Sequence, residues 1–167
     1  MKVILVAAVT VNGMIAEKVE QSSLDWTSKE DLQFFIEKSK EAGVVIMGAK
    51  TFQTLKKPLK DRLMVVLSYE PEKESEIEGV VYMNKKPSEV IEWLEIKGYP
   101  QVVLAGGGSI YTQYLQAGLV NEMFLTVEPY LFGEGIPLAQ GFERIKMTLV
   151  DVKKLGESSV NLHYKLK

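Results

Sequence analysis

Short apolar runs recur along the first two thirds of the chain, and amphipathic stretches separate them. Four of these runs are continuous and aliphatic, and a fifth is weaker; they are Val3–Val9, Val44–Met47, Leu63–Leu67, Val102–Ala105 and, as the weaker one, Val80–Met83. Continuous runs of this length are typical of strands that are covered on both faces, as in parallel sheets. Strand and helix patterns alternate to about residue 118, which predicts an α/β domain with a largely parallel sheet.

Four segments between these runs have the apolar spacing of helices. They are Thr27–Lys40, Lys50–Leu55, Pro87–Lys97 and Ser109–Ala117. The first opens with Thr27-x-x-Glu30, a capping-box pattern. The third has a proline in its first turn and Gly98 just beyond its end, which are start and stop signals in the expected order.

The last third of the chain has a different pattern. Glu122–Val127, Lys146–Lys153 and Ser159–Leu166 read as strands with no helix between them. Apolar and polar residues alternate in the last one, which predicts a hairpin strand with one solvent face, and His163 falls on that face. We therefore expect residues 1–167 to form one three-layer α/β domain. Its mixed eight-stranded sheet is expected to be mostly parallel, with an antiparallel C-terminal edge hairpin and about four flanking helices.

Composition narrows the chemistry that the chain can perform. Lys and Arg number 20 and Asp and Glu 22, a net charge of −2, which disfavours nucleic-acid binding. There is no cysteine and one histidine, so thiolate chemistry, cysteine zinc sites and multi-histidine metal sites are excluded, and no metal is expected. No apolar run reaches the roughly 20 residues of a membrane span. The lack of cysteine fits the cytoplasm, which is the expected location.

Two strand-to-helix turns are candidates for binding an anion. Gly106-Gly107-Gly108 lies between a strand and a helix start, where glycines and free N–H groups favour phosphate. A tight strand-to-helix turn explains these glycines equally well. Gly48 and Lys50 form a second such turn, for which a plain connection is the simpler interpretation.

Two charged residues are candidates for contact with a substrate. Asp31 lies at the rim of the apolar stripe of its helix, where partial burial would raise its pKa and make it a proton donor. The pattern Ser28-x-x-Asp31 is also a helix cap. Arg62 precedes a strand and could bind a ligand carboxylate, although a loop arginine is usually solvated.

Taken in order, these segments resemble the dihydrofolate reductase family over nearly the whole chain. The segments that carry the resemblance are Ala7–Ala16, Trp26 followed by Asp31-Leu32 and Phe35, Val45–Phe52, Lys57–Arg62, Ala105–Tyr111 and Leu125-Thr126. The resemblance implies NADPH-dependent reduction of 7,8-dihydrofolate to 5,6,7,8-tetrahydrofolate by hydride transfer. It also implies a cis peptide bond between Gly106 and Gly107.

The resemblance further implies a role for each matching position. Asp31 would hold the pterin ring and, through water, support protonation of its N5 atom, with Thr126 hydrogen-bonded nearby; these two are the implied catalytic residues. The implied substrate-binding residues are Val6, Ala7, Leu32, Phe35, Leu55 and Arg62. The implied NADPH-binding residues are Ala8, Ile15, Gly48, Lys50, Thr51, Ser68, Ala105, Gly106, Gly107, Gly108, Ser109, Ile110 and Tyr111.

Three features depart from the common pattern of that family. Ala49 stands where an arginine usually grips the 2′-phosphate region of NADPH, and the loop Ala16–Asp25 is longer than usual. The segment Thr126–Pro137 is more similar to the reductase domain of riboflavin biosynthesis, whose members are often homodimers. Two alternatives therefore stay open. One is an NADPH-dependent reductase of 5-amino-6-(5-phosphoribosylamino)uracil, and the other is a non-catalytic nucleotide-binding relative. Asp31 and Arg62 favour the folate substrate.

Overall fold

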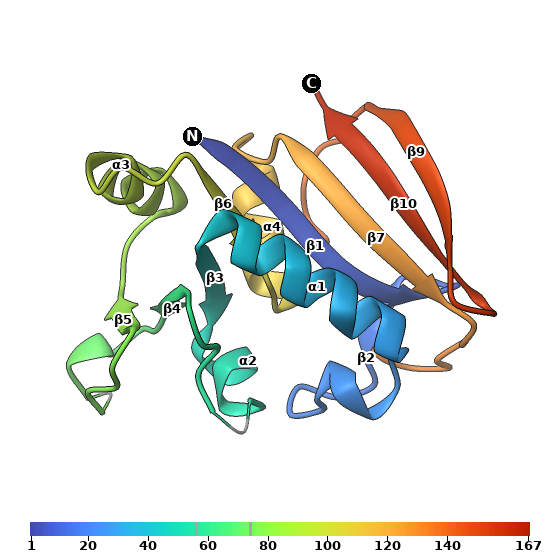
Figure 1. Ribbon diagram of the computed structural model, residues 1–167, viewed down its shortest axis with the longest axis horizontal. Coiled ribbons are helices and arrows are strands. Elements are labelled where there is room, and N and C mark those ends of the chain that lie inside the picture. The colour runs from blue at the N-terminus through green and yellow to red at the C-terminus, as the bar shows by residue number, and fades with distance from the viewer. Residues whose placement is uncertain (56, 74) are drawn as a thin grey trace.

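The computed structural model describes residues 1–55, 57–73 and 75–167 and contains one large mixed sheet (Figure 1). Its eight strands lie in the order β5-β4-β3-β6-β1-β7-β10-β9. They are β1 Lys2–Thr10, β3 Val44–Gly48, β4 Leu63–Leu67, β5 Val80–Met83, β6 Gln101–Leu104, β7 Glu122–Glu128, β9 Met147–Leu155 and β10 Ser159–Leu166. The strands from β5 to β7 pair in parallel, whereas β10 runs antiparallel to both β7 and β9. The predicted sheet is confirmed.

Helices cover both faces of this sheet and make it a three-layer structure. They are α1 Lys29–Ala42, α2 Ala49–Gln53, α3 Pro87–Ile96 and α4 Gly108–Gln116. α1 and α2 pack over one face, where Val45, Met47 and Val66 are buried. α3 and α4 pack over the other face around Leu5 and Ile46. Each central strand is therefore buried on both sides, which is why it is a continuous apolar run.

The start of α1 differs from the prediction. Ser28 is its N-cap, and the Ser28 Oγ accepts a hydrogen bond from the backbone N–H of Asp31 at 3.2 Å. The predicted capping box between Thr27 and Glu30 is therefore wrong, and the alternative pattern of Ser28 and Asp31 forms the cap. An acidic residue in the first turn of a helix is also favoured by the helix dipole.

A second, two-stranded sheet was not predicted. β2 Met14–Ala16 pairs antiparallel with β8 Ile136–Pro137. Strands of two or three residues are too short to show a period of two in the sequence. This small sheet joins the loop after β1 to the loop after β7.

The predicted solvent face of β10 is wrong. Ser159 and Asn161 are buried, and the ring of His163 stacks on Phe124 with 4.1 Å between ring centroids. α1 lies on this side of the sheet, where its Phe34 packs against Phe124 of β7 (Figure 1). The polar positions at the start of β10 are therefore buried, whereas Lys165 near its end is exposed. By contrast, β9 at the sheet edge is exposed from Met147 to Lys154.

Candidate active site

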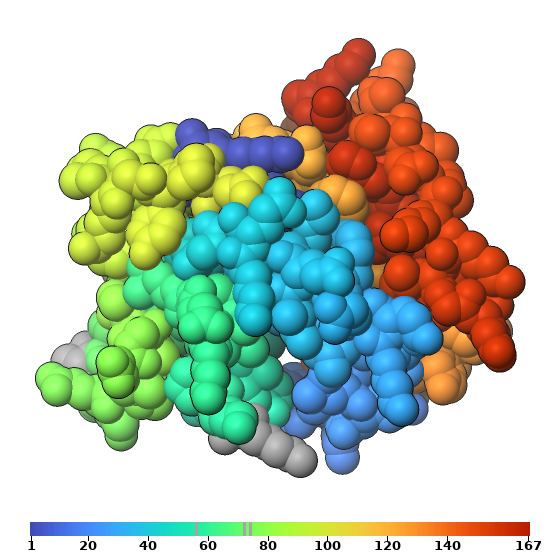
Figure 2. Space-filling model, in the orientation of Figure 1, coloured from blue at the N-terminus to red at the C-terminus, as the bar shows by residue number. Residues whose placement is uncertain are grey.

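A cavity of about 800 Å³ opens at the carboxyl ends of β1, β3, β4 and β6. In Figure 2 the surface is hollowed between the segment of α2 and the loop that follows β2. The carboxyl edge of a parallel sheet is the usual ligand site of α/β folds, because strand ends, turns and helix N-termini meet there.

Most of the residues expected to contact ligands line this cavity. Every position expected to bind NADPH lies on the cavity wall, from Ala8 and Ile15 through Ser68 to Tyr111. The wall also contains the expected substrate-binding residues Val6, Ala7, Phe35 and Leu55, together with Asp31. One continuous space is thus bounded by both sets of residues.

Three expected site residues lie off the wall. Leu32 is 37% exposed on α1, since one residue along a helix turns the side chain by about 100° away from Asp31. The Arg62 guanidinium donates hydrogen bonds to Ser39 Oγ at 2.6 Å and to the carbonyl of Lys60 at 2.9 Å. Thr126 is fully buried behind Asp31, so it cannot contact a ligand directly.

The glycine turn before α4 has the geometry that the resemblance implied. The peptide bond between Gly106 and Gly107 is cis, and Gly106 has φ of +104°, a region that side chains disfavour. A Cβ atom on Gly107 would lie 3.1 Å from Thr51 Oγ1, and one on Gly108 would lie 2.9 Å from the carbonyl oxygen of Pro137. The turn is therefore packed tightly between α2 and β8. The first turn of α4 borders the cavity. The N–H groups of Ile110 and Tyr111 in this turn donate to the carbonyl of Gly107, so those of Gly108 and Ser109, at the start of the helix, are the ones that a ligand could use.

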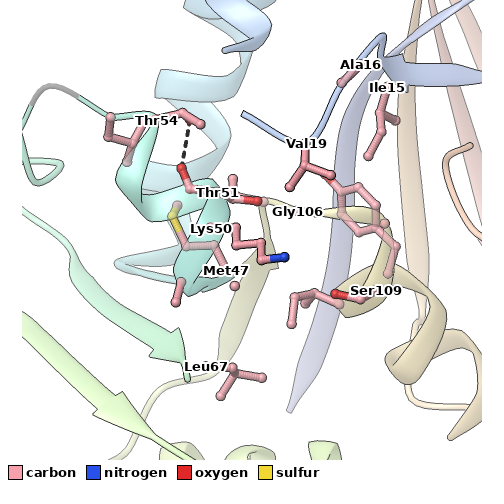
Figure 3. A pocket seen from close by; sticks show the side chains of 18 of the residues that line it. Ile15, Ala16, Val19, Met47, Lys50, Thr51, Thr54, Leu67, Gly106 and Ser109 are labelled. Atoms are coloured by element: carbon pink, nitrogen blue, oxygen red, sulfur yellow. Dashed lines mark hydrogen bonds between the residues drawn. The ribbon is translucent and has the colours of Figure 1, made fainter. Parts of the chain in front are cut away.

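Three lysines of the described chain line this cavity, and Lys50 is the one beside the glycine turn. Lys50 extends its amino group into the space between α2 and Ser109 (Figure 3). Lys73 and Lys85 line the same cavity, and Lys73 is ion-paired with Glu70. Lysines beside the N-terminus of a helix favour a phosphate-bearing ligand.

The sequence did not predict several residues that line the cavity near Lys73 and Lys85. Tyr69 and Glu70 follow β4, and Asn84 and Lys85 follow β5. Their position directly after parallel strands is the signal that could have identified them.

Asp31 is the buried acid of the cavity wall. Its side chain is only 8% exposed, and burial raises its pKa from 3.8 to about 6. This value includes two smaller effects: a hydrogen bond with Thr126 lowers the pKa, and the nearby negative charge of Glu128 raises it. The partial burial predicted from the helix pattern is confirmed. A carboxyl group with a pKa near 6 can exchange a proton close to neutral pH.

The part of the chain that the structure describes contains no group of three or more acidic or histidine side chains able to hold a metal ion. None of its helices is both long and apolar enough to cross a membrane.

Comparison with solved structures identifies the fold. Over all of this chain and 99% of the other, the fold matches a protein from Shewanella sp. PV-4 provisionally assigned to riboflavin biosynthesis, with a TM-score of 0.83 and 21% identity. It also matches dihydrofolate reductase from Enterococcus faecalis, solved with NADP(H), with a TM-score of 0.75 and 20% identity over 99% and 96% of the two chains. The fold is the dihydrofolate reductase-like fold.

The family follows from the sequence match. The dihydrofolate reductase model matches residues 2–128, and the chain belongs to that family. Dihydrofolate reductase from Haemophilus influenzae is 30% identical over 156 residues, which cover 93% of this chain and 90% of that protein.

Proposed function

We propose that this protein reduces 7,8-dihydrofolate to 5,6,7,8-tetrahydrofolate with NADPH. The observation that carries the proposal is Asp31, a buried carboxyl on the wall of the cavity with a pKa near 6. Membership of the family and the similarity to the Haemophilus influenzae enzyme support the same reaction.

The residues of the cavity fit a nicotinamide dinucleotide. The first turn of α4 and Lys50 would hold its phosphates. The small side chain of Ala8 leaves room for a flat ring, and Ile15 offers it an apolar surface. Ala49, which lines this end as well, offers no charge to a 2′-phosphate. The bound cofactor supplies the hydride.

The protein itself supplies orientation and one acid. The Asp31 carboxylate would accept hydrogen bonds from the N–H groups of a pterin ring and so fix which face of the ring is presented. Phe35 and Leu55 would pack against the ring and exclude water. A proton would reach N5 of the ring through a water molecule held at Asp31.

One observation favours a second substrate class. Arg62, which would bind the glutamate carboxylate of a folate, is hydrogen-bonded to Ser39 and lies off the cavity wall. A substrate without a glutamate tail, such as 5-amino-6-(5-phosphoribosylamino)uracil, makes no demand on Arg62. Its ribose phosphate would instead need one of the lysines of the cavity.

The test is oxidation of NADPH followed at 340 nm with purified protein. Turnover that requires dihydrofolate, is blocked by methotrexate and is lost in Asp31→Asn supports the proposal. Turnover with the phosphoribosylaminouracil alone replaces it with the second reaction. Saturable NADPH binding with neither turnover refutes both and supports a non-catalytic relative. A parallel assay with NADH measures the consequence of Ala49.

A further inference from the structure

A second carboxylate, Glu128, is buried behind Asp31 at the end of β7. Its side chain is 1% exposed. Its Oε1 accepts hydrogen bonds from the backbone N–H of Ser28 at 2.8 Å and from the Ser28 hydroxyl at 2.7 Å. Its Oε2 accepts one from the Ser159 hydroxyl at 2.5 Å. All three donors are uncharged, although burying a carboxylate is costly without a cationic partner.

The hydrogen bonds of Glu128 lead to Asp31 through one hydroxyl group. The Ser28 Oγ that donates to Glu128 also accepts the backbone N–H of Asp31 at 3.2 Å. Glu128 thereby fixes both the N-cap of α1 and the orientation of its hydroxyl. Since Asp31 lies in the first turn of α1, its carboxyl moves with this cap.

A second path of hydrogen bonds connects the same strand to the side chain of Asp31. Thr126 lies two residues before Glu128 and so points to the same face of β7. Its Oγ1 accepts a hydrogen bond from Asn161 Nδ2 at 3.0 Å, which leaves its own proton free for the hydrogen bond with Asp31. The backbone and the side chain of Asp31 are thus both held from β7.

We propose that Glu128 is a positioning residue of the active site: through Ser28 it fixes the first turn of α1 and so holds the Asp31 carboxyl at the cavity wall. This inference rests on the proposed role of Asp31. Glu128 is not among the residues that line the cavity, so it acts through Asp31 and not on the substrate.

The charge of Glu128 provides a readout of this role. Burial is the main cause of the raised pKa of Asp31, and Glu128 adds to it. Among the described residues, Tyr111 lines the cavity with Asp31, and three exposed ionisable groups border the groove beside Glu128, namely Glu30, Tyr130 and Glu157. Glu128 is the buried member of this acidic set. Neutralising it should lower the pKa of Asp31.

The experiment compares Glu128→Gln with Glu122→Gln. Glutamine is nearly isosteric and keeps an acceptor for Ser28. Glu122 is the matched control, because it starts the same strand and its loss removes the same charge, but its side chain contacts Lys2 and His163 instead. The readout is the pH titration of the Asp31 carboxyl carbon by NMR in ligand-free protein. The chain has only four aspartates, Asp25, Asp31, Asp61 and Asp151, and Asp31→Asn identifies the signal.

In Glu128→Gln we expect the pKa of Asp31 to fall by roughly 0.5–1, the size expected for one like charge nearby. In Glu122→Gln the pKa of Asp31 should not change. In the NADPH assay, kcat should fall at least fivefold with an unchanged KM for NADPH, and its pH profile should shift toward lower pH. An unchanged Asp31 titration in folded Glu128→Gln overturns the inference, even if the melting temperature is lower.

A second variant keeps the inference testable if Glu128→Gln does not fold. Ser28→Gly removes the hydroxyl that joins Glu128 to the N–H of Asp31, and it retains the charge of Glu128 and the backbone N–H that donates to it. Glycine is also tolerated at the N-cap of a helix. The expected result is a fall in kcat of roughly tenfold at unchanged NADPH affinity, since a small misplacement of the acid slows the reaction. An unchanged kcat overturns the inference. Absence of all dihydrofolate turnover in the wild type refutes the proposed function, whereas the NMR titration still tests the role of Glu128.

Discussion

Asp31→Asn should stabilise the folded protein while it removes the proposed activity. The structure explains why, because Asp31 is buried in surroundings that disfavour its charge. Asparagine has nearly the same shape, carries no charge and can still accept the hydrogen bond of Thr126. The variant therefore mimics the protonated aspartic acid at every pH.

The magnitude follows from the pKa of the carboxyl group. It is 3.8 in the unfolded chain and about 6 in the folded protein, a difference of 6 − 3.8 = 2.2. At 1.36 kcal/mol per pH unit, ionised Asp31 destabilises the fold by about 3 kcal/mol at pH 7.5. Because the folded state binds this proton more tightly, wild-type stability falls as the pH rises from about 4 to about 6. Well below pH 4 the carboxyl group is protonated in both the folded and the unfolded state, so Asp31 no longer destabilises the fold.

Urea unfolding at pH 4 and at pH 7.5 measures this effect. We expect Asp31→Asn to lie within about 0.5 kcal/mol of the wild type at pH 4 and to exceed its free energy of unfolding by about 3 kcal/mol at pH 7.5. Asp151→Asn, on the exposed strand β9, is the matched control and should change stability by less than about 0.5 kcal/mol at either pH. A variant of Asp31 that is no more stable than the wild type at pH 7.5 would refute the burial argument.

Three further predictions concern two residues of the cavity wall and Arg62, which lies off it. Lys50→Gln should raise the KM for NADPH roughly tenfold at low salt and less at high salt, because it removes a cation that salt screens; a salt-independent effect would point to packing instead. Gly108→Ala should weaken NADPH binding in a titration followed by fluorescence, because its Cβ would lie 2.9 Å from the carbonyl oxygen of Pro137; unchanged affinity would mean that β8 shifts freely. Arg62→Ala should raise the KM for dihydrofolate roughly tenfold at constant kcat, which is the size expected for the loss of one charged hydrogen bond. The substitution also removes the hydrogen bond that Arg62 donates to Ser39. An unchanged KM would mean that the glutamate tail binds elsewhere.

The architecture of the sheet could be predicted because burial leaves a simple trace in the sequence. β1, β3 and β4 are covered on both faces and are therefore continuous apolar runs. The glycine turn and the rim position of Asp31 could be located for similar reasons, since a helix start and an apolar stripe are local patterns.

The residues behind Asp31 could not be predicted in this way. Ser159 and Asn161 are polar residues of the C-terminal hairpin, and a period of two assigns such residues to solvent. Glu128 falls just beyond the expected strand Glu122–Val127, so no pattern marked it as buried. Their burial depends on α1, which is distant in sequence and passes over that face. The sequence also could not show whether Leu32 and Arg62 reach a ligand, because the answer depends on how far the cavity extends.

The small sheet of β2 and β8 has a consequence for limited proteolysis. The exposed loop from residue 17 to residue 20 contains a trypsin site at Lys18. One end of the segment is attached through β2 to β8, and the other end through Ser28 to Glu128. A cut after Lys18 thus leaves both new ends fastened to the same stretch of chain. The nicked protein should migrate as one intact particle under native conditions and separate into two fragments only in denaturant.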